Sequence, residues 1–132
     1  MKKIIIAAVV LLLLPVGCAT IADKSRIEEY ENTMDGYESA MRLSDFNAAC
    51  QFVDPAVISR EACLARYENL KLTSYDVLEM KPSNNNHEVN QSVAIEYYFL
   101  DRHVVEKIQH KQQWRYQEDA KVWMLQTGPP RF

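Results

Sequence analysis

The side chains best suited to acid–base chemistry in this sequence are His110 and Tyr97, which fall in neighbouring segments of alternating polar and apolar residues. If both segments are strands, the two side chains share an apolar face, with His110 as general base and Tyr97 as hydrogen-bond donor. That face carries no carboxylate, because Glu96 has the opposite parity. An acid to orient the imidazole would have to come from earlier positions, namely Asp35, Glu38 or Asp45. A lone histidine that only packs on a strand is the alternative interpretation.

The sequence predicts no metal site and no cofactor. The three histidines are 16 and 7 residues apart, and none has a partner at the short spacings that zinc sites use. The three glycines are scattered, so there is no glycine-rich loop for a phosphate group.

Aromatic residues indicate two further kinds of site. A pocket for an apolar ligand would be lined by Tyr37, Tyr97, His110, Gln112 and Trp114. The helical and strand spacing of these residues fits plain core packing as well. Tyr98 has the opposite parity and stands among charged residues, which indicates a surface for a partner protein, formed by Tyr98, Lys107, Lys111 and Arg115.

The scaffold for these residues is predicted to be three helices followed by four strands. Apolar residues spaced three and four apart, from Ile27 to Met41, predict one long amphipathic helix. Ser44 or Asp45 would cap a short second helix, Asp54-Pro55 is typical of another helix start, and a third helix is expected over about 59–70. Strands are expected over 72–80, about 93–100, 107–116 and 122–125.

Two cysteines of the predicted domain, Cys50 and Cys63, are candidates for a disulfide. Export would place them in an oxidising compartment, where such pairs usually bridge. Two buried thiols on neighbouring helices are the alternative. The chain of 132 residues has a formal net charge of −3, which becomes −5 once Lys2 and Lys3 are removed with an export signal. An acidic domain argues against nucleic acid as a partner.

The amino terminus is typical of an exported protein. Two lysines precede Ile4–Leu14, an apolar run of 11 residues that is too short to cross a bilayer. The following Val16-Gly17-Cys18 resembles the end of a bacterial lipoprotein signal, although Pro15 stands where that pattern prefers leucine. The resemblance implies cleavage before Cys18 and a diacylglyceryl group on its sulfur. An ordinary secretory signal, cut after Ala19 or Ala22, is the alternative.

This resemblance divides the chain into a signal peptide over 1–17, a lipidated tether over 18–25 and a single domain over 26–132. It makes the membrane a partner through acyl chains such as palmitate. Because Ala19 replaces the aspartate that commonly retains lipoproteins at the inner membrane, it implies an outer-membrane location facing the periplasm.

The order of predicted elements, with Trp114, Trp123 and Leu125 in a final hairpin, resembles the nuclear-transport-factor-2-like, or cystatin-like, family. The resemblance implies an α+β cone, in which a bent antiparallel sheet of about four strands wraps around the long helix. Because this fold hosts many activities, three functions stay open. The first is a non-enzymatic envelope lipoprotein that binds a small apolar ligand or a partner envelope protein, also as a homodimer. The second is an acid–base enzyme similar to ketosteroid isomerase, which requires an open pocket at His110. The third is an assembly factor of a membrane complex, which requires a closed cone and an exposed apolar patch around Tyr98.

Overall fold

The long amphipathic helix is present and is longer than expected. A computed structural model describes residues 18–132, so the predicted signal peptide over 1–17 and the side chain of Cys18 lie outside the described part. Helix α1 spans Cys18–Arg42 and buries Tyr30, Met34, Tyr37 and Met41 along one stripe. Its first residues, 18–25, which were predicted to be a lipidated tether, are helical. No glycine or proline interrupts the chain between Cys18 and Gly36, which allows the helix to extend.

Two short helices follow. Helix α2 (Phe46–Cys50) is capped by Asp45, whose Oδ1 accepts a hydrogen bond from the Ala48 N–H at 3.1 Å. Helix α3 (Arg60–Ala65) is capped by Ser59 and is shorter than predicted. The predicted helix start at Asp54-Pro55 was wrong, because the Asp54 carboxylate accepts from the Ala56 N–H and closes a turn without a helix.

The predicted disulfide between Cys50 and Cys63 is confirmed, with the two Cα atoms 6.0 Å apart. It joins α2 to α3. In the chain-entropy model, a closed loop of this size stabilises the fold by about 3 kcal/mol.

The four strands form an antiparallel sheet in the order β1-β2-β3-β4. Their bounds are β1 Leu70–Pro82, β2 Glu88–Phe99, β3 Glu106–Gln117 and β4 Val122–Leu125. Strand β1 contains two irregularities, between Leu72 and Ser74 and between Val77 and Glu79. The α+β class and the four-stranded sheet are as predicted. Within residues 18–132, no helix is long and apolar enough to cross a membrane.

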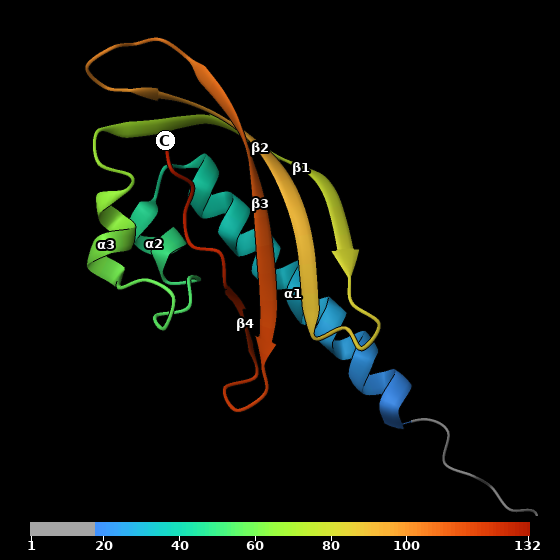
Figure 1. Cartoon of the computed structure of the whole chain (residues 1–132). Helices are drawn as coiled ribbons and strands as arrows, with labels where there is room; N and C mark the ends of the chain where they lie inside the picture. Colours follow the sequence, from blue (N-terminus) through green and yellow to red (C-terminus); the bar gives the residue numbers. More distant parts are fainter. Residues whose placement is uncertain (1–17) are drawn as a thin grey trace, which may run out of the picture.

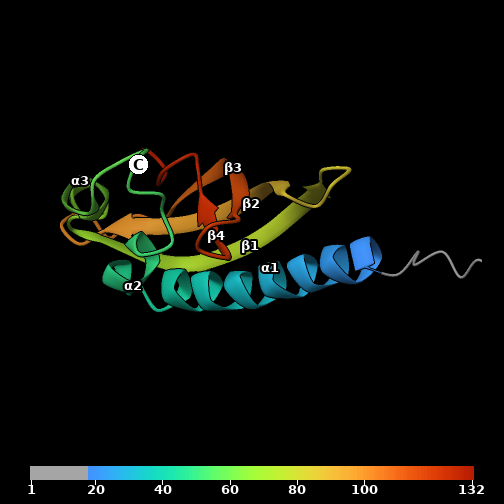
Figure 2. The same ribbon diagram turned by 90° about the horizontal axis from the view of Figure 1, so that it is seen from below.

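The sheet bends around α1, which packs along its inner face, while α2 and α3 lie at one end (Figures 1 and 2). The predicted parity of the strands is correct, since Val93, Ile95 and Tyr97 of β2 are buried and Glu96 and Tyr98 are only partly covered. We call the side of the sheet toward α1 the inner face and the opposite side the outer face.

Candidate functional site

A cluster of hydrogen-bonded polar side chains occupies the middle of the inner face. Gln112 Oε1 accepts from Gln91 Nε2 at 2.9 Å and from the Trp114 indole N–H at 3.2 Å. The Tyr30 hydroxyl donates to Gln91 Oε1, and Gln112 Nε2 donates to the Tyr75 hydroxyl at 3.2 Å. All five side chains are buried. The cluster therefore satisfies its own polar groups, as a packed core requires.

His110 borders this cluster without a catalytic partner. Its Nδ1 lies 3.3 Å from Gln112 Nε2, an amide donor that neither accepts nor supplies a proton in catalysis. Burial lowers the pKa of His110 to about 4, so the imidazole is neutral at pH 7. The acids expected to orient it are placed elsewhere: Asp35 is exposed on α1 and Asp45 caps α2. Glu38, on α1, makes no hydrogen bond with His110 in the part of the chain described.

Tyr97 is not brought to His110 either. His110 lies opposite Val93 and Tyr97 lies opposite Glu106, so the two candidates are four residues apart along the paired strands, or about 13 Å. The Tyr97 hydroxyl donates to Glu106 Oε2 at 2.9 Å. Burial and, as the smaller cause, the Glu106 carboxylate raise the pKa of Tyr97. The pair therefore has no shared position for a substrate.

The aromatic side chains of the predicted ligand pocket fill the interior. Tyr37 and Trp114 are fully buried and meet edge to face, with ring centroids 5.1 Å apart. The Tyr37 hydroxyl has no hydrogen-bond partner among residues 18–132, and burial, together with the nearby Tyr67, raises its pKa. Of the five predicted pocket residues, only Gln112 borders either of two surface hollows in the part of the chain that the structure describes.

The carboxyl-terminal segment closes one side of this interior. Gly128, Pro129 and Pro130 are buried, and Arg66 Nη1 donates to the Pro129 carbonyl at 3.0 Å. The Phe132 ring packs edge to face on Tyr97, with centroids 4.8 Å apart. Residues 128–132 had no predicted role beyond the last strand, and this cover was missed. The proline pair was the available signal, because proline has no N–H that burial would leave unsatisfied.

The larger hollow lies mainly on the outer face of the sheet. It has a volume of about 640 Å³. Its lining is mostly neutral amides and charged side chains of β1, β2 and β3, together with Thr127 from the segment after β4: Glu79, Lys81, Asn90, Gln91, Ser92, Gln109, Lys111, Gln112 and Gln113. The smaller hollow, of about 280 Å³, lies beside the disulfide. Both are open depressions on the surface.

The predicted partner surface is exposed, but its charges are largely paired. Lys107 Nζ lies 3.1 Å from Glu96 Oε1, and Arg115 Nε lies 3.1 Å from Glu88 Oε1. Tyr98 stands near the hairpin between β2 and β3, with its ring 6.0 Å from that of His103. Three aliphatic side chains at this hairpin are exposed, namely Leu100 at 49%, Val104 at 61% and Val105 at 57%. We call Tyr98, Leu100, Val104 and Val105 the hairpin end.

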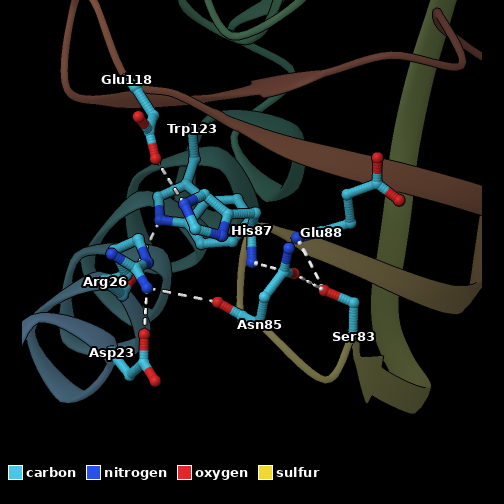
Figure 3. A network of polar contacts seen from close by, with 8 residues as sticks. All are labelled: Asp23, Arg26, Ser83, Asn85, His87, Glu88, Glu118 and Trp123. Atoms are coloured by element: carbon cyan, nitrogen blue, oxygen red, sulfur yellow. Dashed lines mark hydrogen bonds and ion pairs between the residues drawn. The ribbon is translucent and has the colours of Figure 1, made fainter. Parts of the chain in front are cut away.

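The opposite end of the sheet carries a polar network that sequence reasoning missed (Figure 3). We call this the base network. His87 Nε2 lies 2.5 Å from Glu118 Oε1, which joins the β1–β2 turn to the β3–β4 turn. Arg26 of α1 pairs with Asp23 and donates to the Asn85 carbonyl at 3.2 Å. The indole N–H of Trp123 donates to the Arg26 carbonyl at 2.9 Å.

Two nitrogens of the base network, Arg26 Nε and His87 Nδ1, are buried without a hydrogen-bond partner in the described part of the chain. Within that part, no group of three or more potential ligand side chains could hold a metal ion. Through the Arg26–Asn85 and His87–Glu118 contacts, the network joins α1 to both turns at this end of the sheet. Its only sequence signal was the run of asparagines in the turn, which marks a loop but not the partners of that loop.

Comparison with known proteins adds little to this site. No protein-family model and no curated protein matches the chain. A solved structure, described as the intermembrane space region of chloroplast protein ARC6, is similar with a TM-score of 0.40 and 10% sequence identity, over 87% of this chain and 97% of that one. A likeness at this level carries no information about function.

Proposed function

We propose that this protein is a non-enzymatic cell-envelope lipoprotein that binds another envelope protein through the hairpin end. One observation carries the proposal: the interior is filled by the protein's own side chains, whereas Leu100, Val104 and Val105 stand exposed beside Tyr98. Clustered aliphatic and aromatic residues on a soluble domain are typical of a surface that a partner covers. A closed interior with an apolar patch at Tyr98 is the combination expected of an assembly factor.

The filled interior supports a protein partner over a small apolar ligand. Ligand sites are usually concave and largely preformed. Here Trp114 and Tyr37 occupy the centre of the inner face, and residues 128–132 cover its side. An acid–base enzyme would in addition need a proton acceptor with a partner, and among residues 18–132 the His110 ring has a hydrogen-bond contact only with the Gln112 amide.

The direction of α1 supports a partner away from the membrane. The base network ties Arg26 to the turns at one end of the sheet, and Arg26 lies eight residues, or about 12 Å of helix, beyond Cys18. The hairpin end lies at the far end of β2, a strand of 12 residues that spans about 40 Å (Figure 1). A lipid on Cys18 would therefore direct the hairpin end away from the bilayer and toward other proteins.

The proposal includes a family, the nuclear-transport-factor-2-like domains, and a location, the outer membrane. The α+β architecture agrees with a nuclear-transport-factor-2-like domain, and the predicted signal peptide agrees with an outer-membrane lipoprotein facing the periplasm. The test is direct: Cys18→Ser should leave the protein unprocessed and unlabelled by fatty acid. Normal cleavage and release of this variant would contradict lipidation.

Site-specific photo-crosslinking in intact cells tests the partner surface. A photoreactive residue at Val104 should give a discrete adduct of higher mass, and Leu100→Ser with Val105→Ser should abolish it. Val122 is the matched control, because it is also an exposed valine, at 44%, but lies at the other end of the sheet, on β4. Equal adducts from both positions, or none from Val104, would contradict the proposal. A small molecule of stoichiometric mass retained in native mass spectrometry would instead favour ligand binding.

A further inference from the structure

The free edge of β1 is covered over one half and open over the other. Strand β1 is an edge strand. In its first half, Ser44 Oγ accepts from the Leu72 N–H at 3.0 Å, and Arg42 donates to the Tyr75 carbonyl from Nε at 3.2 Å and from Nη2 at 3.0 Å. Within residues 18–132, no hydrogen bond from outside the sheet reaches the main chain of 76–82, which we call the open segment.

The pairing register identifies the main-chain groups that are open. The Tyr75 carbonyl faces the free edge, so Tyr75 and its partner Ile95 form a non-hydrogen-bonded pair. The main-chain N–H and C=O groups of Ile95 therefore point toward β3. Alternate residues of β2, including Val93 and Gln91, then also face β3. Because Val77 pairs with Val93 and Met80 with Gln91, both Val77 and Met80 direct their N–H and C=O groups at the free edge.

The irregularity between Val77 and Glu79 determines the spacing of these groups. In a regular strand, residues that direct their main-chain groups at the same edge are two positions apart, whereas Val77 and Met80 are three positions apart. Both side chains remain on the inner face and are exposed, at 41% and 43%. Val77 and Met80 therefore offer four unpaired hydrogen-bonding groups next to their own apolar side chains, a combination suited to the addition of another strand.

We propose that a second copy of this chain pairs with the open segment in antiparallel orientation, with Val77 opposite Met80 of the second copy and Met80 opposite Val77. The unusual spacing is the same in both copies, so both pairs form together and all four groups of each edge are used. A register that placed Met80 opposite itself would use only one residue of each edge. The product is a two-fold dimer with one continuous sheet of eight strands.

Charge favours the second copy as the occupant. In this register, Asp76 lies opposite Lys81 of the second copy, and Lys81 lies opposite Asp76. Both are on the outer face, because their β2 partners Ala94 and Asn90 are, and opposite charges across paired strands are favourable. Pro82, the last residue of β1, lacks an N–H and limits the pairing to this segment. The interface is small, so we expect a dimer with a dissociation constant in roughly the micromolar range.

The proposal does not rest on the proposed function, because the open segment and the hairpin end are different surfaces. The test uses the full chain, purified in detergent, with its mass followed against concentration by sedimentation. Lys81→Asp and Asp76→Lys should each weaken the dimer about tenfold or more, and the double exchange should restore it. The matched control is Lys71→Asp, an exposed lysine in the covered half of β1, which should leave the dimer unchanged.

Cysteine pairs test the register. Directly opposite residues are about 5.5 Å apart, which is within the reach of a disulfide. Val77→Cys combined with Met80→Cys should give a covalent dimer on mild oxidation, while either change alone should not. A chain that is monomeric at all concentrations, a dimer insensitive to the charge exchange, a dimer from Met80→Cys alone, or crosslinks only to another protein would each overturn the proposal.

Discussion

The two ends of the sheet are built differently. At the base, Trp123 is buried against Tyr30 and Tyr116, and its indole N–H is bonded to the Arg26 carbonyl. At the hairpin end, Leu100, Val104 and Val105 are largely exposed. Side chains at the base therefore act on the stability of the fold, whereas those at the hairpin end are available to a partner. Substitutions at each end should separate these two roles.

The largest expected effect is at the base. Trp123→Ala removes a large side chain that is 1% exposed and should lower the free energy of unfolding by about 3–5 kcal/mol. Denaturant unfolding of the full chain measures the loss. The neighbouring Val122→Ala is the control and should change stability by less than about 0.5 kcal/mol. A loss below about 1 kcal/mol for Trp123→Ala would mean that the base is not the stabilising end.

The second effect is at the disulfide between the two short helices. Replacing both Cys50 and Cys63 by serine should lower the free energy of unfolding by about 3 kcal/mol. A reducing agent should cause a similar loss in the unmodified protein and none in the double variant. If the reductant leaves the unfolding midpoint of the unmodified protein unchanged, the bridge does not stabilise the fold as argued.

The third effect depends on pH and arises between the two ends, at His110. Its folded pKa, about 4, lies below the ordinary value of 6.5, so the unfolded chain binds a proton first as the pH falls. The stability from neutral His110 is complete above pH 6.5 and declines between pH 6.5 and 4. When the pH is lowered from 7 to 4.5, the free energy of unfolding of the His110→Gln variant should therefore fall by about 2 kcal/mol less than that of the unmodified protein. Equal losses in the two proteins would show that His110 is accessible to protons in the folded state.

The smallest effect on stability is expected at the hairpin end. Val104→Ser should change the free energy of unfolding by less than about 0.5 kcal/mol, because the side chain is mostly in water already. The same variant, with its photoreactive probe moved to Leu100, should reduce the partner adduct several-fold. A large loss of stability from Val104→Ser would remove the distinction between the two ends.

Local patterns predicted the elements well. The period of two in β4 predicted residues 122–125, and the structure has Val122–Leu125. Helical spacing predicted the buried stripe of α1, and strand parity placed Tyr98 outside and Trp114 inside. These predictions succeed because a side chain's direction follows from its own backbone geometry, and burial of one face selects the pattern.

Long-range contacts were beyond such patterns. Nothing local indicates that Gln91 meets Gln112, that His87 meets Glu118 across two turns, or that Phe132 packs on Tyr97. The irregularity near Leu78, which determines the spacing of the β1 edge, is equally invisible, because it depends on pairing with β2.

The sequence by itself determined the class of fold and the faces of its helix and strands, because each depends on residue type and spacing along the chain. Only the tertiary structure decided that the interior is filled and that His110 and Tyr97 are far apart. It also decided which half of the β1 edge is open. These features depend on the register between strands and on the volume that packed side chains leave, and both are settled only when distant segments meet.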